Sequence, residues 1–118
     1  MEGASSLSSP LGQIRISHDA VAQIAGRVAA EAYGVVGMAP RGPRDRLPLR
    51  DRLRQGIAVG GADGEVTIEL TVIVEYGLNL AEVASTLRNR VRYEVERLTG
   101  LRVAEVDVRI QDVKSSSA

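Results

Sequence analysis

The amino-acid sequence predicts an α+β domain in which two helices pack on one face of a four-stranded, mainly antiparallel sheet. One segment alternates between apolar and mostly polar residues, and two others place apolar residues at three- and four-residue steps. The predicted elements follow one another in the order β-α-β-β-α-β. Two apolar helix stripes and one apolar sheet face bury one another in two layers, which favours this fold over an all-helical bundle or a sandwich.

The composition fits one small globular domain. The chain has 118 residues, 44% of them hydrophobic, and its 15 basic residues balance 15 acidic ones. We expect residues 1–12 to form a disordered N-terminal tail, residues 13–113 to form the domain, and residues 114–118 to form a loose C-terminal tail. No stretch has the roughly 20 consecutive apolar residues that a membrane-spanning helix needs, so we expect no direct span.

The first strand and helix are predicted before residue 34. Ile14 and Ile16 alternate with polar neighbours, and Ser17 stands where the N-cap of a helix is expected. Gly34 is a typical helix stop. The apolar stripe between cap and stop comprises Val21, Ile24, Ala25, Val28, Ala29 and Ala32.

A basic loop rich in Pro and Arg is predicted at residues 40–54. Its prolines interrupt regular structure, although residues 49–53 could form one helical turn. Six arginines against Asp45 and Asp51 give residues 41–54 a net charge of +4, which suits an anionic surface or an acidic partner. The candidate anion- or partner-binding residues are Arg41, Arg44, Arg46, Arg50, Arg52 and Arg54.

A β-hairpin follows the loop. Ile57 and Val59 begin one strand, and the glycines around Asp63 favour a chain reversal. The return strand from Val66 to Tyr76 points one apolar set of residues one way and a second set, polar except for Ile73, the other way. The second set, which we expect to be exposed and to form a candidate interaction surface, comprises Thr67, Glu69, Thr71, Ile73 and Glu75.

The second helix and the last strand complete the predicted fold. Asn79 followed by Glu82 resembles a capping box, and Gly100 supplies the helix end. The stripe between them comprises Leu80, Val83, Ala84, Leu87, Val91, Val95 and Leu98. The last strand is predicted from Val106, Val108 and Ile110, which alternate with polar residues.

The residue inventory argues against catalysis. There is no cysteine, and His18 is the single histidine, so neither a thiolate nucleophile, a Cys-ligated zinc site nor a well-supported Ser/His/Asp triad is expected. Glu69 and Glu75 lie six residues apart on one strand, roughly 20 Å at about 3.3 Å per residue, which is too far for a shared site. We therefore expect no enzyme, no cofactor, no metal and no small-molecule substrate.

An RNA-binding module is the alternative hypothesis. Residues 34–37 have the pattern G-x-x-G after a helix, and the order of elements is similar to that of the KH module, which clamps single-stranded RNA. Val35 and Val36 are poorly suited to lie along phosphates, and aromatic residues for base stacking make up only 3% of the chain. Nucleic acid is therefore the second choice of partner.

Three segments resemble the alkaline shock protein family, also called the envelope stress response proteins. They are Gly34-Val35-Val36-Gly37-Met38, Val74-Glu75-Tyr76-Gly77-Leu78-Asn79-Leu80-Ala81-Glu82-Val83 and Leu98-Thr99-Gly100-Leu101. The resemblance runs from about Gln13 to Val113, and the Pro40 to Arg54 insertion departs from it.

The resemblance implies a non-enzymatic, cytoplasmic bacterial protein of cell-envelope homeostasis. Such proteins self-associate and attach to the inner face of the membrane through an integral membrane partner. The expected role is a self-associating scaffold that docks through its exposed sheet face or its basic loop.

Overall fold

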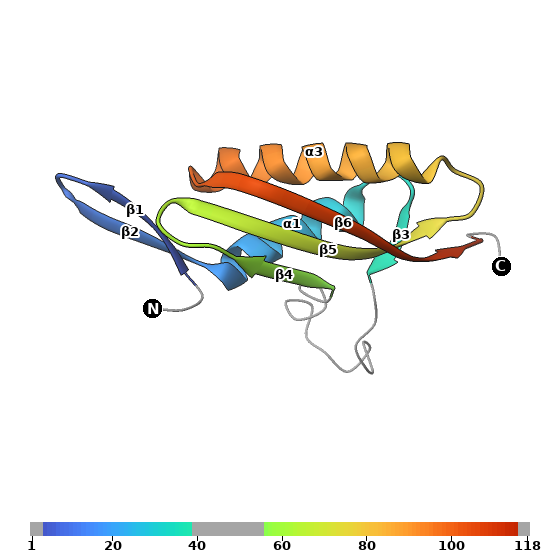
Figure 1. Ribbon diagram of the computed structural model, residues 1–118, viewed down its shortest axis with the longest axis horizontal. Helices are drawn as coiled ribbons and strands as arrows, with labels where there is room; N and C mark the ends of the chain where they lie inside the picture. The colour runs from blue at the N-terminus through green and yellow to red at the C-terminus, as the bar shows by residue number, and fades with distance from the viewer. Residues whose placement is uncertain (1–3, 39–55, 116–118) are drawn as a thin grey trace.

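The computed structural model describes residues 4–38 and 56–115, and its main body has two layers (Figure 1). The six arginines of the basic loop and the predicted turn at residues 49–53 lie outside the described residues. One layer is a sheet, and both helices lie on one face of it, as the sequence predicts. The sheet contains β3 (Val35–Met38), β4 (Ile57–Gly60), β5 (Glu65–Glu75) and β6 (Arg102–Lys114), and the helices are α1 (His18–Glu31) and α3 (Leu80–Thr99).

Strand β5 is the centre of the sheet. Strand β4 pairs antiparallel with its first half, where Ile57 lies opposite Leu70, and β3 pairs antiparallel with its second half, where Met38 lies opposite Val72. Strand β6 pairs with β5 along its whole length and in parallel. Because β6 takes one edge of β5, strands β3 and β4 share the other edge, end to end. The 20 residues of α3 carry the chain back so that β6 can run parallel to β5.

The caps predicted at Ser17, Asn79 and Gly100 are confirmed, whereas α1 ends at Glu31 with Ala32 as its C-cap, two residues before the predicted stop at Gly34. The Ser17 hydroxyl accepts a hydrogen bond of 3.0 Å from the backbone N–H of Ala20, and the Asn79 side chain accepts one of 3.0 Å from Glu82. Gly100 ends α3 in the left-handed conformation, with φ of 76°, and its N–H donates to the Glu96 carbonyl. These local bonds fix both ends of α3 and the start of α1.

The core lies between the sheet and the helices. Strand β5 contributes its predicted apolar face, and α3 contributes Val83, Leu87, Val91 and Val95. The outermost members of the predicted α3 stripe, Leu80 and Leu98, are exposed because they lie at the two ends of the helix. The buried β5 residues are Val66, Ile68, Leu70, Val72 and Val74.

The N-terminal segment differs from the prediction. Strand β1 (Ala4–Ser9) pairs antiparallel with β2 (Gly12–Ser17) in a separate two-stranded sheet, which projects from one end of the main body (Figure 1). A disordered tail over residues 1–12 is therefore wrong from Ala4 onward. The buried Ser5 hydroxyl anchors β1, because it donates to the Glu65 carbonyl at 3.1 Å.

The four strands of the main sheet are also not the four that the sequence predicts. The strand around Ile14 and Ile16 belongs to the hairpin, and β3 takes its place in the main sheet. At the other end of the chain, Lys114 is the last residue of β6 and not part of a tail, because its carbonyl accepts a 2.8 Å bond from Tyr76.

Candidate interaction surfaces

The face of β5 that points away from the helices holds most of the predicted interaction residues. Thr67 and Glu69 are exposed there, and Thr71 and Glu75 are half-buried. Ile73 is only 7% exposed, so its prediction as an exposed residue is wrong. Ile73 lies between Gly37 of β3 and Asp112 of β6, and neighbours on both sides leave little of its side chain accessible.

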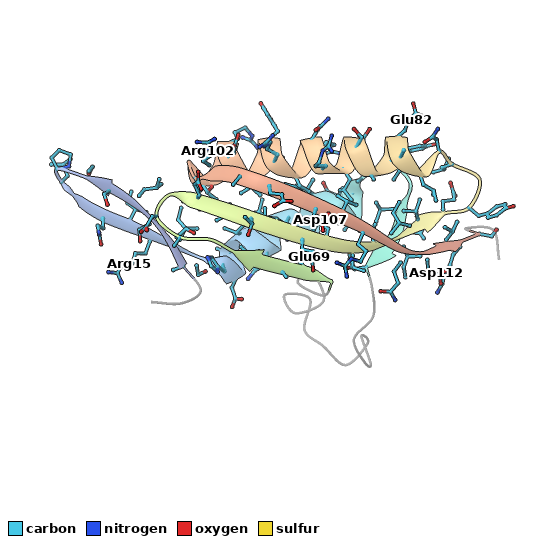
Figure 2. All side chains as sticks on the ribbon, in the orientation of Figure 1. Arg15, Glu69, Glu82, Arg102, Asp107 and Asp112 are labelled. Carbon is cyan, nitrogen blue, oxygen red and sulfur yellow. The ribbon has the colours of Figure 1, made fainter. Side chains whose placement is uncertain are left out.

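Strand β6 widens this surface, which we call the open face: Thr67, Glu69 and Thr71 with Glu105, Asp107 and Arg109. The three β6 residues lie beside the three β5 residues in register, and Figure 2 shows Glu69 and Asp107 on neighbouring strands. Arg109 pairs with Glu69 at 3.5 Å. A shallow hollow in this face is lined by both strands and by Ala58 and Gly60 of β4.

The open face is acidic around Asp107. Asp107 lies beside Glu69 in the ladder, and within residues 4–38 and 56–115 its carboxylate has no hydrogen bond or ion pair. Glu105 lines the same hollow. These carboxylates do not form a metal site, since no cluster of three His, Cys, Asp or Glu side chains occurs within the described ranges. The sequence alone does not predict that the charged residues of β6 lie on this face, because the alternation of apolar and polar residues along a strand does not reveal which strands are neighbours.

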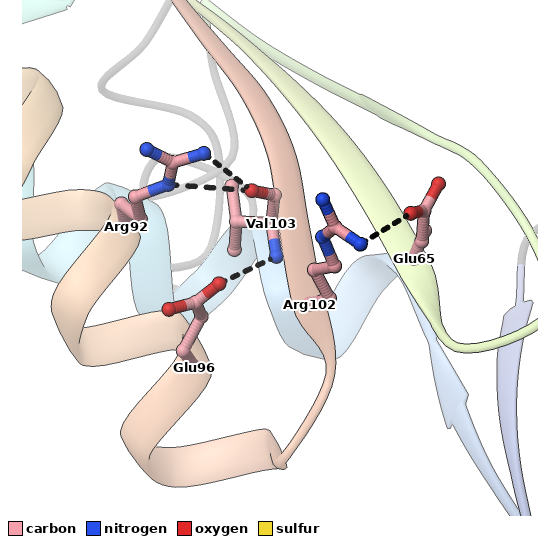
Figure 3. Close-up of polar contacts among 5 residues, drawn as sticks. All are labelled: Glu65, Arg92, Glu96, Arg102 and Val103. Atoms are coloured by element: carbon pink, nitrogen blue, oxygen red, sulfur yellow. Dashed lines mark hydrogen bonds and ion pairs between the residues drawn. The ribbon is translucent and has the colours of Figure 1, made fainter.

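The outer edge of β6 carries a second feature (Figure 3). The Arg92 guanidinium donates hydrogen bonds of 3.3 Å and 2.9 Å to the Val103 carbonyl, and the Glu96 carboxylate accepts one of 2.9 Å from the Val103 N–H. Two side chains of α3 thus satisfy the edge groups of one β6 residue, as a neighbouring strand would. Edge strands of sheets are often protected in such ways.

Two exposed tyrosines mark the end of the body where β5 meets α3. Tyr33 and Tyr76 are 75% and 76% exposed, and the 2.8 Å bond from the Glu75 N–H to the Gly34 carbonyl brings their backbones together. Leu80 is exposed at the same end, at the start of α3. Tyrosine presents a large amphipathic surface at low entropic cost, so this end also suits contact with a macromolecule.

One charged pair lies within α3. Arg97 donates hydrogen bonds of 3.1 Å and 2.9 Å to the Glu94 carboxylate. These bonds hold the pKa of the Glu94 carboxyl below its ordinary value. The pair is exposed to solvent and therefore stabilises the helix only slightly.

The sole histidine has a structural partner. His18 begins α1, and its Nε2 lies 3.4 Å from the Ser5 hydroxyl, which is itself bonded to the Glu65 carbonyl. This contact links the β1–β2 hairpin to the main body, and no carboxylate within residues 4–38 and 56–115 bonds to the ring as in a catalytic triad.

The G-x-x-G segment is built into the sheet. Gly34 turns the chain with φ of 88°, and residues 35–38 form β3, with Gly37 opposite Ile73 of β5. The Gly34 carbonyl accepts the bond from Glu75. A segment paired in this way is not a free loop for gripping phosphates, which removes the main structural basis of the KH hypothesis.

No helix within the described residues is long and apolar enough to cross a membrane.

Comparison with known proteins identifies the family. Residues 6–115 match the model of the alkaline shock protein 23 family, which is described by a "cell envelope-related function". The chain is 33% identical over 112 residues to the protein YloU of Bacillus subtilis, covering 92% of this chain and 93% of that protein. It is 25% identical over 107 residues to a stress response regulator gls24 homolog of Streptococcus pyogenes, covering 88% of this chain and 60% of that protein.

A solved structure shares the fold. The protein named MamM CTD H264E superposes with a TM-score of 0.51 at 13% identity, over 80% of this chain and 94% of that one. Neither the family description nor the names of the two relatives describes an enzymatic reaction. The match over residues 6–115 and the similarity to YloU show that the chain belongs to the alkaline shock and Gls24 protein family, which has a cell envelope-related function.

Proposed function

We propose that the protein is a non-enzymatic, self-associating scaffold of cell-envelope homeostasis that docks to a membrane-anchored partner at the inner face of the cell membrane. The open face is the observation that carries this proposal. A two-layer domain buries one side of its sheet under helices, and here the other side exposes polar and charged residues of β5 and β6.

The chemistry of the open face suggests the kind of partner. Glu69 is neutralised by Arg109, whereas Glu105 and Asp107 leave an excess of negative charge around the hollow. A basic segment of the partner, extended enough to lie in the hollow, would complement it. Thr67 and Thr71 would supply hydroxyl groups for hydrogen bonds at its rim.

The basic loop offers a second docking element. Its net charge of +4 follows from the sequence alone, and an anionic lipid surface attracts such segments. In this proposal the loop approaches the membrane while the open face holds the anchored protein.

A capture experiment tests the docking proposal. The purified chain is mixed with detergent-solubilised membranes of the cell that produces it, and the retained proteins are identified by mass spectrometry. The open-face variant combines Thr67→Arg with Glu105→Arg, which reverses the charge of the hollow without touching a described ion pair. The control is Arg88→Glu, an exposed charge reversal on α3.

We expect the wild-type chain and the control to retain the same integral membrane protein and the open-face variant to lose it. Equal capture by all three proteins would contradict docking through this face. Recovery of RNA instead, with affinity that falls steeply as salt rises, would favour the RNA-binding hypothesis.

A further inference from the structure

We propose that the outer edge of β6 pairs with the same edge of a second copy, antiparallel, about a twofold axis through Val108. This inference rests on the self-association in the proposed function and specifies its surface. The pairing would join the sheets of the two copies into one continuous sheet, with both open faces on the same side.

The edge is regular over residues 105–110. The register with β5 skips Ala104 and Gln111, so a bulge lies at each end of this stretch. Strand β6 pairs only with β5, and no other described residue bonds to the backbone of residues 105–110. The side-chain cover from Arg92 and Glu96 reaches Val103 alone. The stretch therefore keeps a free row of backbone donors and acceptors, which is a template for strand addition.

The sequence of this stretch is self-complementary. Val106-Asp107-Val108-Arg109-Ile110 carries opposite charges symmetrically about its central valine. In an antiparallel pair centred on Val108, Asp107 lies opposite Arg109 of the second copy, and Val106 lies opposite its Ile110. The charged pairs fall on the open face and the apolar pairs on the helix side, because side chains alternate along each strand.

Other registers pair like charges. Centring the pair on Asp107 sets two carboxylates directly opposite each other, and centring it on Arg109 does the same for two guanidinium groups. Like charges directly opposite destabilise a strand pair, whereas opposite charges each stabilise it. Charge thus selects the register centred on Val108.

Among the described residues, Asp107 has no counter-charge from its own chain. Its ladder neighbour Glu69 repels it, and Arg109 of the same chain pairs with Glu69. Arg109 of the second copy would approach Asp107 from the free edge, so that each guanidinium group lies between Glu69 of its own chain and Asp107 of the other. The dimer thus brings Asp107 a counter-charge that the described part of its own chain does not.

The flanking features limit this edge contact to two copies. The bulges at Ala104 and Gln111 interrupt the regular edge, and Arg92 and Glu96 already occupy the edge groups of Val103. A twofold pairing also uses the same edge on both copies and leaves none for a third.

A single-cysteine series tests the register in a chain without native cysteine. Directly opposite Cα atoms in antiparallel strands lie roughly 4.5–5.5 Å apart, within the range that a disulfide spans. Val108→Cys should form a disulfide dimer under mild oxidation. Asp107→Cys, which is more exposed, should form much less, because its two copies would lie about 8 Å apart, beyond the reach of a disulfide.

A charge swap tests the same contact without cysteine. Asp107→Arg and Arg109→Asp should each raise the dimer dissociation constant about tenfold or more in sedimentation equilibrium, since each sets two like-charged pairs across the axis. The double variant should restore the wild-type constant, because it exchanges the charges and keeps them opposite.

The outcomes separate the two proposals. If the wild-type chain stays monomeric at high concentration, both the pairing through the β6 edge and the proposed self-association are overturned. The wild-type chain could instead form an oligomer whose dissociation constant neither single charge reversal changes and which cross-links no better through Val108→Cys than through Asp107→Cys. That result overturns pairing through the β6 edge alone, and self-association would then use another surface.

Discussion

Arg92 of α3 holds the backbone carbonyl of Val103 with two hydrogen bonds, of 3.3 Å and 2.9 Å (Figure 3). Together with the bond from the Val103 N–H to Glu96, they fasten the start of β6 to the helix that precedes it. These bonds fix the point at which the chain leaves α3 and enters β6, parallel to β5. They therefore also position the half of the open face that β6 supplies.

Replacing Arg92 should therefore destabilise the fold more than its exposed position suggests. Arg92→Ala leaves the partly buried Val103 carbonyl without its donors, and we expect a loss of about 1 kcal/mol in the free energy of unfolding. Urea denaturation measures it. Arg88→Ala is the matched control, because the one hydrogen bond of the Arg88 guanidinium within the described ranges goes to Ser85, at 3.4 Å. Equal effects of the two substitutions would show that the Val103 bonds contribute nothing.

A side chain at Gly34 should destabilise the fold. A Cβ atom there would lie 2.9 Å from Leu78 Cδ1 and 3.0 Å from Val83 Cγ2, and the φ of 88° is unfavourable for alanine. Gly77→Ala is the control, since its φ of 100° is also positive but nothing lies within 4 Å. Thermal denaturation should show Gly34→Ala to be less stable than Gly77→Ala by about 1–3 kcal/mol of packing strain. Equal losses would mean that the backbone conformation alone matters.

Ser5 should control the attachment of the hairpin. Its hydroxyl is fully buried and bonded to the Glu65 carbonyl, so Ser5→Ala leaves that carbonyl unsatisfied at a cost of about 1–2 kcal/mol. Hydrogen exchange should speed up across residues 4–17 while β5 keeps its protection. Ser8→Ala, at an exposed position of the same strand, should change neither. Faster exchange throughout the main body would contradict a local role.

The basic loop gives a prediction from charge alone. Replacing Arg41, Arg44, Arg46, Arg50, Arg52 and Arg54 with Ser should abolish binding to vesicles that contain anionic lipid, because it removes six positive charges from one segment. Vesicle sedimentation measures the binding, and neutral vesicles are the control. Unchanged binding to anionic vesicles would reject the loop as a membrane contact.

Features that depend on neighbouring residues could be predicted from the sequence. Ser17, Asn79 and Gly100 cap their helices through bonds to residues three or four positions away, so their roles follow from local chemistry. The alternation in β5 likewise predicts which of its faces is buried.

Features that depend on residues far apart in the sequence could not be predicted from it. Strand β1 is rich in serine, and its anchor is a bond from Ser5 to a carbonyl 60 residues away. Strand β3 has the sequence of a glycine-rich turn and becomes a strand because β5 offers it an edge. Ile73 points to the face that alternation predicts, but it is buried by neighbours whose strand order no alternation reveals.

Site-specific photocross-linking in the producing cell tests the central claim most directly, which is that the open face contacts another protein. A photoreactive amino acid replaces Thr71 on the open face or, as the control, Arg97 on the outer side of α3. We expect an adduct with an integral membrane protein from position 71 and none from position 97. No adduct at position 71, or the same adduct from both positions, would contradict the account.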